Sequence, residues 1–76
     1  MKPRILVIDD EAAIRESLRM ILEYENYEFV GAASGPDGIL QVRRDPPDMV
    51  VLDIKMPGTN GLETLAEIRK LDESLP

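Results

Sequence analysis

Residues 5–11 read Ile-Leu-Val-Ile-Asp-Asp-Glu, four apolar side chains in a row followed directly by three acidic ones. An unbroken apolar run, without the alternation of a half-exposed strand, is typical of a β-strand that is buried on both faces. Strands of this kind occur in parallel sheets, where helices cover both sides. The stretch therefore predicts the first strand of a parallel sheet, with carboxylates just beyond its end.

The next part of the chain has the pattern of a helix and then of a weaker strand. Asp9-Asp10-Glu11 offers capping oxygens and negative charge for a helix N-terminus, and apolar residues recur at helical spacing over residues 12–25. These apolar residues are Ile14, Leu18, Ile21 and Leu22. Asn26 suits a helix C-terminus. Residues 27–33 then predict a second strand.

A turn, a short helix and a third strand follow. Ser34-Gly35-Pro36-Asp37 has the composition of a turn and a helix N-cap. The helix around residues 39–42 must stop at Asp45-Pro46-Pro47, because proline lacks an amide donor and constrains the residue before it. Residues 49–52, Met-Val-Val-Leu, are apolar throughout and predict another buried strand.

A loop over residues 54–60 precedes a third helix that is expected to begin near Gly61. Apolar residues recur along this helix every three positions, which we interpret as a face that packs on the core: Leu62, Leu65, Ile68 and Leu71. The apolar face of the first helix has the same interpretation. The pairs Arg43-Arg44 and Arg69-Lys70 are interpreted as solvated side chains that suit the helix dipole.

The alternation of three strands with three helices indicates an α/β fold made of βαβ units with right-handed crossovers. A chain of 76 residues fits one domain, and 43% hydrophobic residues are enough for a core. With nine Lys and Arg against fifteen Asp and Glu, the net charge is -6. Such a surface repels phosphates and anionic lipid, so direct nucleic-acid or membrane binding is not expected.

The absence of two residue types excludes several kinds of chemistry. The chain has no cysteine and no histidine, which rules out disulfides, thiolate or imidazole metal sites, and triads that need a histidine base. Neither a signal peptide nor an apolar run of membrane-spanning length is visible, so the cytoplasm is the expected compartment.

Acidic side chains follow two of the predicted strands directly. Asp9 and Asp10 come after the first apolar run, and Asp53 comes after the third. If these strands are neighbours, the three carboxylates meet at the carboxyl edge of the sheet, where functional groups of open α/β sheets collect. Their mutual repulsion calls for a cation, and hard oxygen ligands suit Mg²⁺, which in turn suits phosphoryl transfer.

These residues resemble the receiver domain of bacterial two-component response regulators. The resemblance rests on residues 5–11, on Pro47-Asp48-Met-Val-Val-Leu-Asp53, and on Lys55-Met-Pro-Gly58 with Gly61, and it runs along the whole chain. It implies a flavodoxin-like parallel sheet of order 2-1-3-4-5, of which this chain would form the three strands in the order 2-1-3. It also implies a signalling module rather than an enzyme.

The resemblance assigns roles to particular residues. Asp53 would be the phosphoacceptor, attacking the phosphorus of a phosphohistidine on a sensor histidine kinase. Asp10 would ligate Mg²⁺ directly, and Asp9 through water or by its charge. The backbone carbonyl of Lys55 would be a further ligand, oriented by the Met56-Pro57-Gly58 loop.

The sequence departs from the family in its length. A receiver normally has five βα units, so residues 1–76 are expected to be a partial receiver without the last two units and their phosphate-binding Ser/Thr and Lys. Phosphorylation is then expected to be slow or absent. The outer edge of residues 49–52 would be unpaired and Ile14, Leu18 and Leu22 partly bare, which predicts self-association.

Three other functions are weighed against this interpretation. A truncated receiver could act as an oligomerising interaction module without phosphotransfer. A phosphatase of the haloacid-dehalogenase type also uses an aspartate after a strand with Mg²⁺, but it needs Asp-x-Asp, and the third position here is Glu11. A nucleotide or flavin binder is disfavoured because no glycine-rich loop follows the first strand.

Overall fold

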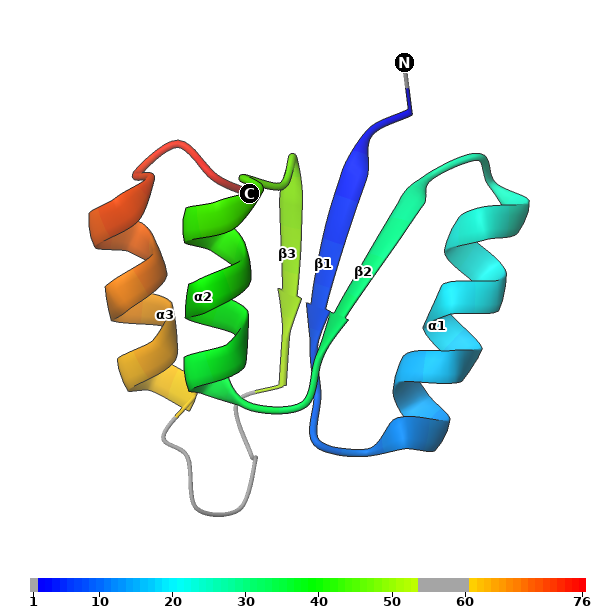
Figure 1. Ribbon diagram of the computed structural model, residues 1–76, viewed down its shortest axis with the longest axis horizontal. Coiled ribbons are helices and arrows are strands. Elements are labelled where there is room, and N and C mark those ends of the chain that lie inside the picture. The colour runs from blue at the N-terminus through cyan, green and yellow to red at the C-terminus, as the bar shows by residue number, and fades with distance from the viewer. Residues whose placement is uncertain (1, 54–60) are drawn as a thin grey trace.

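The computed structural model describes residues 2–53 and 61–76. Three strands and three helices alternate along the chain (Figure 1): β1 (Arg4–Ile8), α1 (Ala12–Tyr24), β2 (Glu28–Ala32), α2 (Gly35–Arg44), β3 (Met49–Leu52) and α3 (Gly61–Leu71). Each expected element is present, with ends that shift by one or a few residues. In the part of the chain described, no helix combines the length and the hydrophobicity that crossing a membrane requires.

The strands form one parallel sheet in the order β2-β1-β3. The register places Ile8, the last residue of β1, opposite Ala32 on β2 and Leu52 on β3. All three strands therefore end at the same edge of the sheet. The predicted α/β class, the parallel pairing and the order 2-1-3 are confirmed.

Helices cover both faces of the sheet. In Figure 1, α1 lies on one side, and α2 and α3 lie together on the other. The main core lies between the sheet and the helices α2 and α3. Its buried members are Leu6, Ile8, Ala32, Val42, Ile68 and Leu75. On β1 the alternate residues Ile5 and Val7 are also buried, 5% and 1% exposed. Because β1 is covered on both faces, its apolar run is continuous.

The ends of α1 match the sequence signals in one respect and differ in another. Asn26, expected at the C-terminus, has φ 66°, a left-handed conformation that asparagine tolerates at helix ends. At the N-terminus, Glu11 is the N-cap and makes no side-chain capping bond. The carboxylate of Asp9 instead accepts a hydrogen bond from the Glu11 N–H at 2.9 Å. The acidic run therefore shapes the turn before the helix rather than capping the helix.

The start of α2 follows its expected turn. The hydroxyl of Ser34 accepts a hydrogen bond from the Asp37 N–H at 3.2 Å, as an N-cap does. Pro36 occupies the first turn of the helix, where its missing donor costs nothing. The helix ends at Arg44, directly before the Asp45-Pro46-Pro47 stop.

The interpretation of the apolar stripe of α3 as a core-packing face is wrong for three of its four residues. Leu62, Leu65 and Leu71 are 59%, 38% and 41% exposed, and of the stripe only Ile68 is buried, at 3%. The buried face consists of Gly61, Thr64 and Ile68. Three-residue spacing falls behind the 3.6-residue turn, so a stripe of this kind winds around the helix and leaves the core.

The apolar face of α1 is only partly covered. The helix has no buried residue, and Ile14 and Ile21 are 41% and 58% exposed. Leu18 and Leu22 are half-buried. The expectation that this face is partly bare is confirmed, and its interpretation as a core-packing face is wrong for Ile14 and Ile21.

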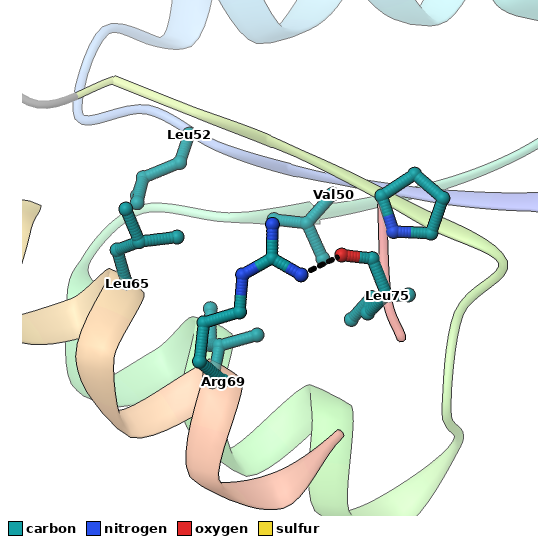
Figure 2. A pocket seen from close by; sticks show the side chains of 7 residues that line it. Val50, Leu52, Leu65, Arg69 and Leu75 are labelled. Carbon is teal, nitrogen blue, oxygen red and sulfur yellow. Dashed lines mark hydrogen bonds between the residues drawn. The ribbon is translucent and has the colours of Figure 1, made fainter. Parts of the chain in front are cut away.

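The segment after α3 lies against the edge of β3. The guanidinium of Arg69 donates to the carbonyl oxygens of Glu73 and Leu75, at 3.0 and 2.6 Å, the latter bond being drawn in Figure 2. The Val50 N–H donates to the carbonyl oxygen of Pro76 at 2.9 Å. Two expectations need correction, because the outer edge of β3 is paired at Val50, and Arg69 holds a neighbouring backbone instead of being only solvated.

Candidate metal centre

The three aspartates singled out in the sequence lie together at the carboxyl edge of the sheet. Each of Asp9, Asp10 and Asp53 offers a carboxylate oxygen, and the three oxygens are within 4.8 Å of one another. Asp9 and Asp53 are half-buried, and Asp10 is exposed. The convergence expected from neighbouring parallel strands is therefore present.

The backbone of the sheet fixes two of these residues. The Asp9 N–H donates to the Ala32 carbonyl of β2, and the Asp53 N–H donates to the Ile8 carbonyl of β1, both at 3.0 Å. Each aspartate thus extends the hydrogen-bond ladder just past the end of its strand. The side chains leave from a rigid backbone, as a preorganised ligand set requires.

A third bond fixes the turn between β1 and α1. Nη1 of Arg15 donates to the backbone carbonyl oxygen of Asp9 at 2.7 Å, and the contact is partly buried. Arg15 is not among the site residues predicted from the sequence. The signal for it is its place in the first turns of α1, because helical side chains point toward the N-terminus and so toward the end of β1.

The donor set and its charge fit a divalent cation. Carboxylates at this separation repel by about 1 kcal/mol per pair even in water, and by more where solvent is partly excluded. All the oxygens are hard ligands, and the chain has no histidine or cysteine to favour a softer metal. The open side at Asp10 leaves space for the waters that Mg²⁺ usually retains.

The remaining predicted ligand, the Lys55 carbonyl, lies outside the described residues, as does the Met56-Pro57-Gly58 loop. The described part of the site therefore consists of two carboxylates from the end of β1 and one from the end of β3. This parallel sheet with acidic groups at its carboxyl edge defines a flavodoxin-like α/β module, in which functional groups collect at that edge.

Comparison with known proteins identifies the class. Residues 5–76 match the family described as the response regulator receiver domain, and the chain belongs to this family of two-component signalling modules. The response regulator MprA of Mycolicibacterium vanbaalenii is 42% identical over 76 residues, which is 100% of this chain and 33% of the relative. The chain spans about a third of the length of the curated relatives that it matches.

Solved structures of response regulators have the same fold as this chain. The response regulator TrrA of Thermotoga maritima, in complex with Mg²⁺-BeF, is 46% identical, with a TM-score of 0.88 over 96% of this chain and 63% of that one. TrrA in complex with the histidine kinase ThkA is 45% identical, with a TM-score of 0.88 over 99% of this chain and 64% of that one. The fold is thus that of receiver domains.

Proposed function

We propose that Asp53 is the phosphoacceptor of a phosphorelay and takes its phosphoryl group from a sensor histidine kinase. The observation that carries the proposal is the meeting of the Asp9, Asp10 and Asp53 carboxylates within 4.8 Å at the carboxyl edge of the sheet. In the proposed step an Asp53 oxygen forms a bond to phosphorus while the phosphorus–nitrogen bond of phosphohistidine breaks. The electron pair of that bond stays with the histidine.

The three carboxylates have different parts in the proposal. Asp10, with its carboxylate exposed, is the direct Mg²⁺ ligand together with Asp53 and the Lys55 carbonyl. Asp9 already uses one oxygen to accept the Glu11 N–H, which suits a contribution through water or by charge. When bound, Mg²⁺ supplies the positive charge that lets an anionic carboxylate approach an anionic phosphoryl group. The rigid backbone at Asp53 holds the nucleophile in place for in-line attack.

The proposed partner is a histidine kinase, and its support is the solved complex of the similar protein TrrA with the kinase ThkA. We also propose a cytoplasmic location, because a histidine kinase phosphorylates its histidine with cytoplasmic ATP. The net charge of -6 supports the further expectation that this chain does not itself contact nucleic acid or membrane lipid.

Labelling with acetyl phosphate in the presence and absence of Mg²⁺ tests the proposal. We expect slow, Mg²⁺-dependent labelling that Asp53→Asn abolishes and Asp48→Asn, at the opposite end of β3, leaves intact. Equal labelling in Asp53→Asn would contradict the assignment. We further infer that residues 1–76 are the first three βα units of a receiver, so a chain that continues beyond Pro76 should label faster.

A second candidate function, that of an interaction module, has its own support. On the α1 side of β3, Met49 and Val51 are 42% and 40% exposed. On the other side, a hollow of about 170 Å³ runs along the strand (Figure 2), lined by Val50, Leu52, Leu65, Ile68, Arg69, Leu75 and Pro76. Apolar surface along an edge strand favours pairing with another chain.

Sedimentation at micromolar concentration tests this candidate. The wild-type chain is expected to associate, and Val51→Lys is expected to shift it toward monomer. Leu40→Lys is the matched control, because Leu40 is 49% exposed on α2, away from β3. A stable, compact wild-type monomer would contradict the candidate.

A further inference from the structure

Arg15 connects α1 to the turn that carries two of the aspartates. Its Nη1 donates to the Asp9 carbonyl oxygen at 2.7 Å, and its own N–H donates to the Glu11 carbonyl at 3.1 Å. Arg15 is half-buried, and it forms none of the side-chain ion pairs found in the described part of the chain. Its guanidinium thus bonds to the backbone of the turn that carries Asp9 and Asp10, which we call the acidic turn.

The stem of this side chain passes beside the neighbouring strand. A Cβ on Gly31 of β2 would lie 3.6 Å from Cδ of Arg15, which is an ordinary van der Waals distance. The stem therefore lies beside β2, and its guanidinium reaches the turn at the end of β1. The contact joins α1 to the sheet, so it belongs to the tertiary structure and not to the helix alone.

The carbonyl that Arg15 contacts belongs to the peptide unit that joins Asp9 to Asp10. Because a peptide unit is planar, a bond that fixes this carbonyl also fixes the Asp10 N–H and the position of the Asp10 Cα, from which the side chain starts. The preceding peptide unit is fixed by the Asp9 N–H bond to Ala32. Both peptide units around Asp9 are thus held, one by β2 and the other by Arg15.

We propose that Arg15 is a positioning residue for the metal site, holding the Asp9–Asp10 peptide so that the Asp10 carboxylate points at the cation. The inference rests on the proposed function, since it assumes that Asp10 is a Mg²⁺ ligand. Groups that orient the ligands of a metal commonly account for about tenfold or more in metal affinity.

A purely electrostatic role makes the opposite prediction. A guanidinium near the carboxylates reduces their negative potential, so its removal would tighten Mg²⁺ binding if charge were its main effect. Under the positioning role, removal frees the peptide unit and weakens binding. The sign of the change in affinity therefore separates the two roles.

The experiment measures Mg²⁺ affinity by calorimetric titration of the 76-residue chain and three variants. Arg15→Met keeps the apolar stem and loses the bond, and it should bind Mg²⁺ about tenfold more weakly. Arg15→Lys keeps the charge and one donor, and it should lie between Arg15→Met and the wild type. Arg19→Met is the control, since it removes the same charge one turn further along α1, where Arg19 pairs with Glu16 and Glu23.

A second readout reports on the backbone. In two-dimensional amide NMR without metal, the Asp10 N–H signal should shift or broaden in Arg15→Met while the signals of β1 and β3 stay unchanged. A role in general stability would move all of them together. If Arg15→Met does not fold, Arg15→Lys carries the test, and wild-type affinity in that variant overturns the proposal.

The outcomes distinguish a failure of the proposed Mg²⁺ site from a failure of the positioning role of Arg15. If the wild type binds no Mg²⁺, the proposed function fails and the role of Arg15 fails with it. If the wild type binds and Arg15→Met binds equally well or more tightly, the metal site stands and the positioning role is overturned. Weaker binding in Arg15→Met with wild-type binding in Arg19→Met supports it.

Discussion

A Cβ placed on Gly38 of α2 would lie 2.3 Å from Cδ1 and 2.7 Å from Cγ1 of Ile8, the last residue of β1. Ile8 is 0% exposed and belongs to the core, so its side chain can move only by displacing other core residues. We expect Gly38→Ala to lower the free energy of unfolding by about 1–3 kcal/mol in urea titrations, despite the better helix propensity of alanine.

A substitution of Ile8 provides the control for Gly38→Ala. Ile8→Val removes Cδ1, the nearer of the two clashing atoms, so Gly38→Ala should cost less in that background. A double-mutant cycle should therefore show a coupling of about 0.5 kcal/mol or more. Additive effects would mean that the two residues do not clash as the geometry indicates.

The effect of the acidic cluster on stability should change sign when the metal binds. In chelator, Asp10→Asn removes like-charge repulsion from groups within 4.8 Å and should raise the free energy of unfolding by about 1 kcal/mol. With Mg²⁺ in excess, the wild type should gain stability through binding and the variant should gain much less. Thermal unfolding with and without Mg²⁺ measures both effects.

Asp45→Asn removes a charge of the same sign at the far end of α2 and serves as the control. It should behave like the wild type in its response to Mg²⁺. A wild-type chain whose melting temperature does not respond to Mg²⁺ would argue against a metal at the cluster.

The two apolar faces of α3 should differ in their effect on stability. Ile68 is 3% exposed and belongs to the core, so Ile68→Ala should cost about 2–5 kcal/mol. Leu71 is 41% exposed, and Leu71→Ala should cost about 1 kcal/mol or less. Chemical denaturation of the two variants measures the difference, and equal losses would contradict the described packing of α3.

One ion pair on α1 should contribute to the acid sensitivity of the fold. A hydrogen bond from Arg19 lowers the pKa of Glu16 in the folded state. A group with a lowered folded pKa adds stability above its unfolded pKa, and this stability is lost as the pH falls through the folded value. Glu16→Gln should therefore lose less stability on acidification than the wild type. Both groups are exposed, so the difference should be small and should shrink at about 0.5 M NaCl.

Much of the fold could be predicted because the informative residues are consecutive in the sequence. Residues 5–8 and 49–52 are unbroken apolar runs of the kind typical of parallel strands; β1 is covered on both faces, whereas β3 leaves Met49 and Val51 exposed. Asp9, Asp10 and Asp53 follow these runs directly. If the strands are neighbours, the clustering of the carboxylates follows from the parallel direction alone.

Other features depend on contacts between distant parts of the chain. The stripe that includes Leu62 and Leu65 looks like a core face until the position of α3 on the sheet is known, and the buried residues Gly61 and Thr64 carry no hydrophobic signal. The bond from Arg15 to the Asp9 carbonyl depends on how α1 packs against the sheet, which no local pattern reveals. The pairing of Val50 with Pro76 is likewise tertiary.

The absence of any buried residue in α1 has a consequence for how this molecule fluctuates. Segments with few buried apolar side chains open at a lower free-energy cost than the whole domain, so the amides of α1 should exchange with deuterium before those of β1. Each such opening breaks the link between Arg15 and the acidic turn. In the proposed role of Arg15, a local opening of α1 also releases the peptide unit before Asp10, so the dynamics of this helix limit how tightly the turn can hold an ion.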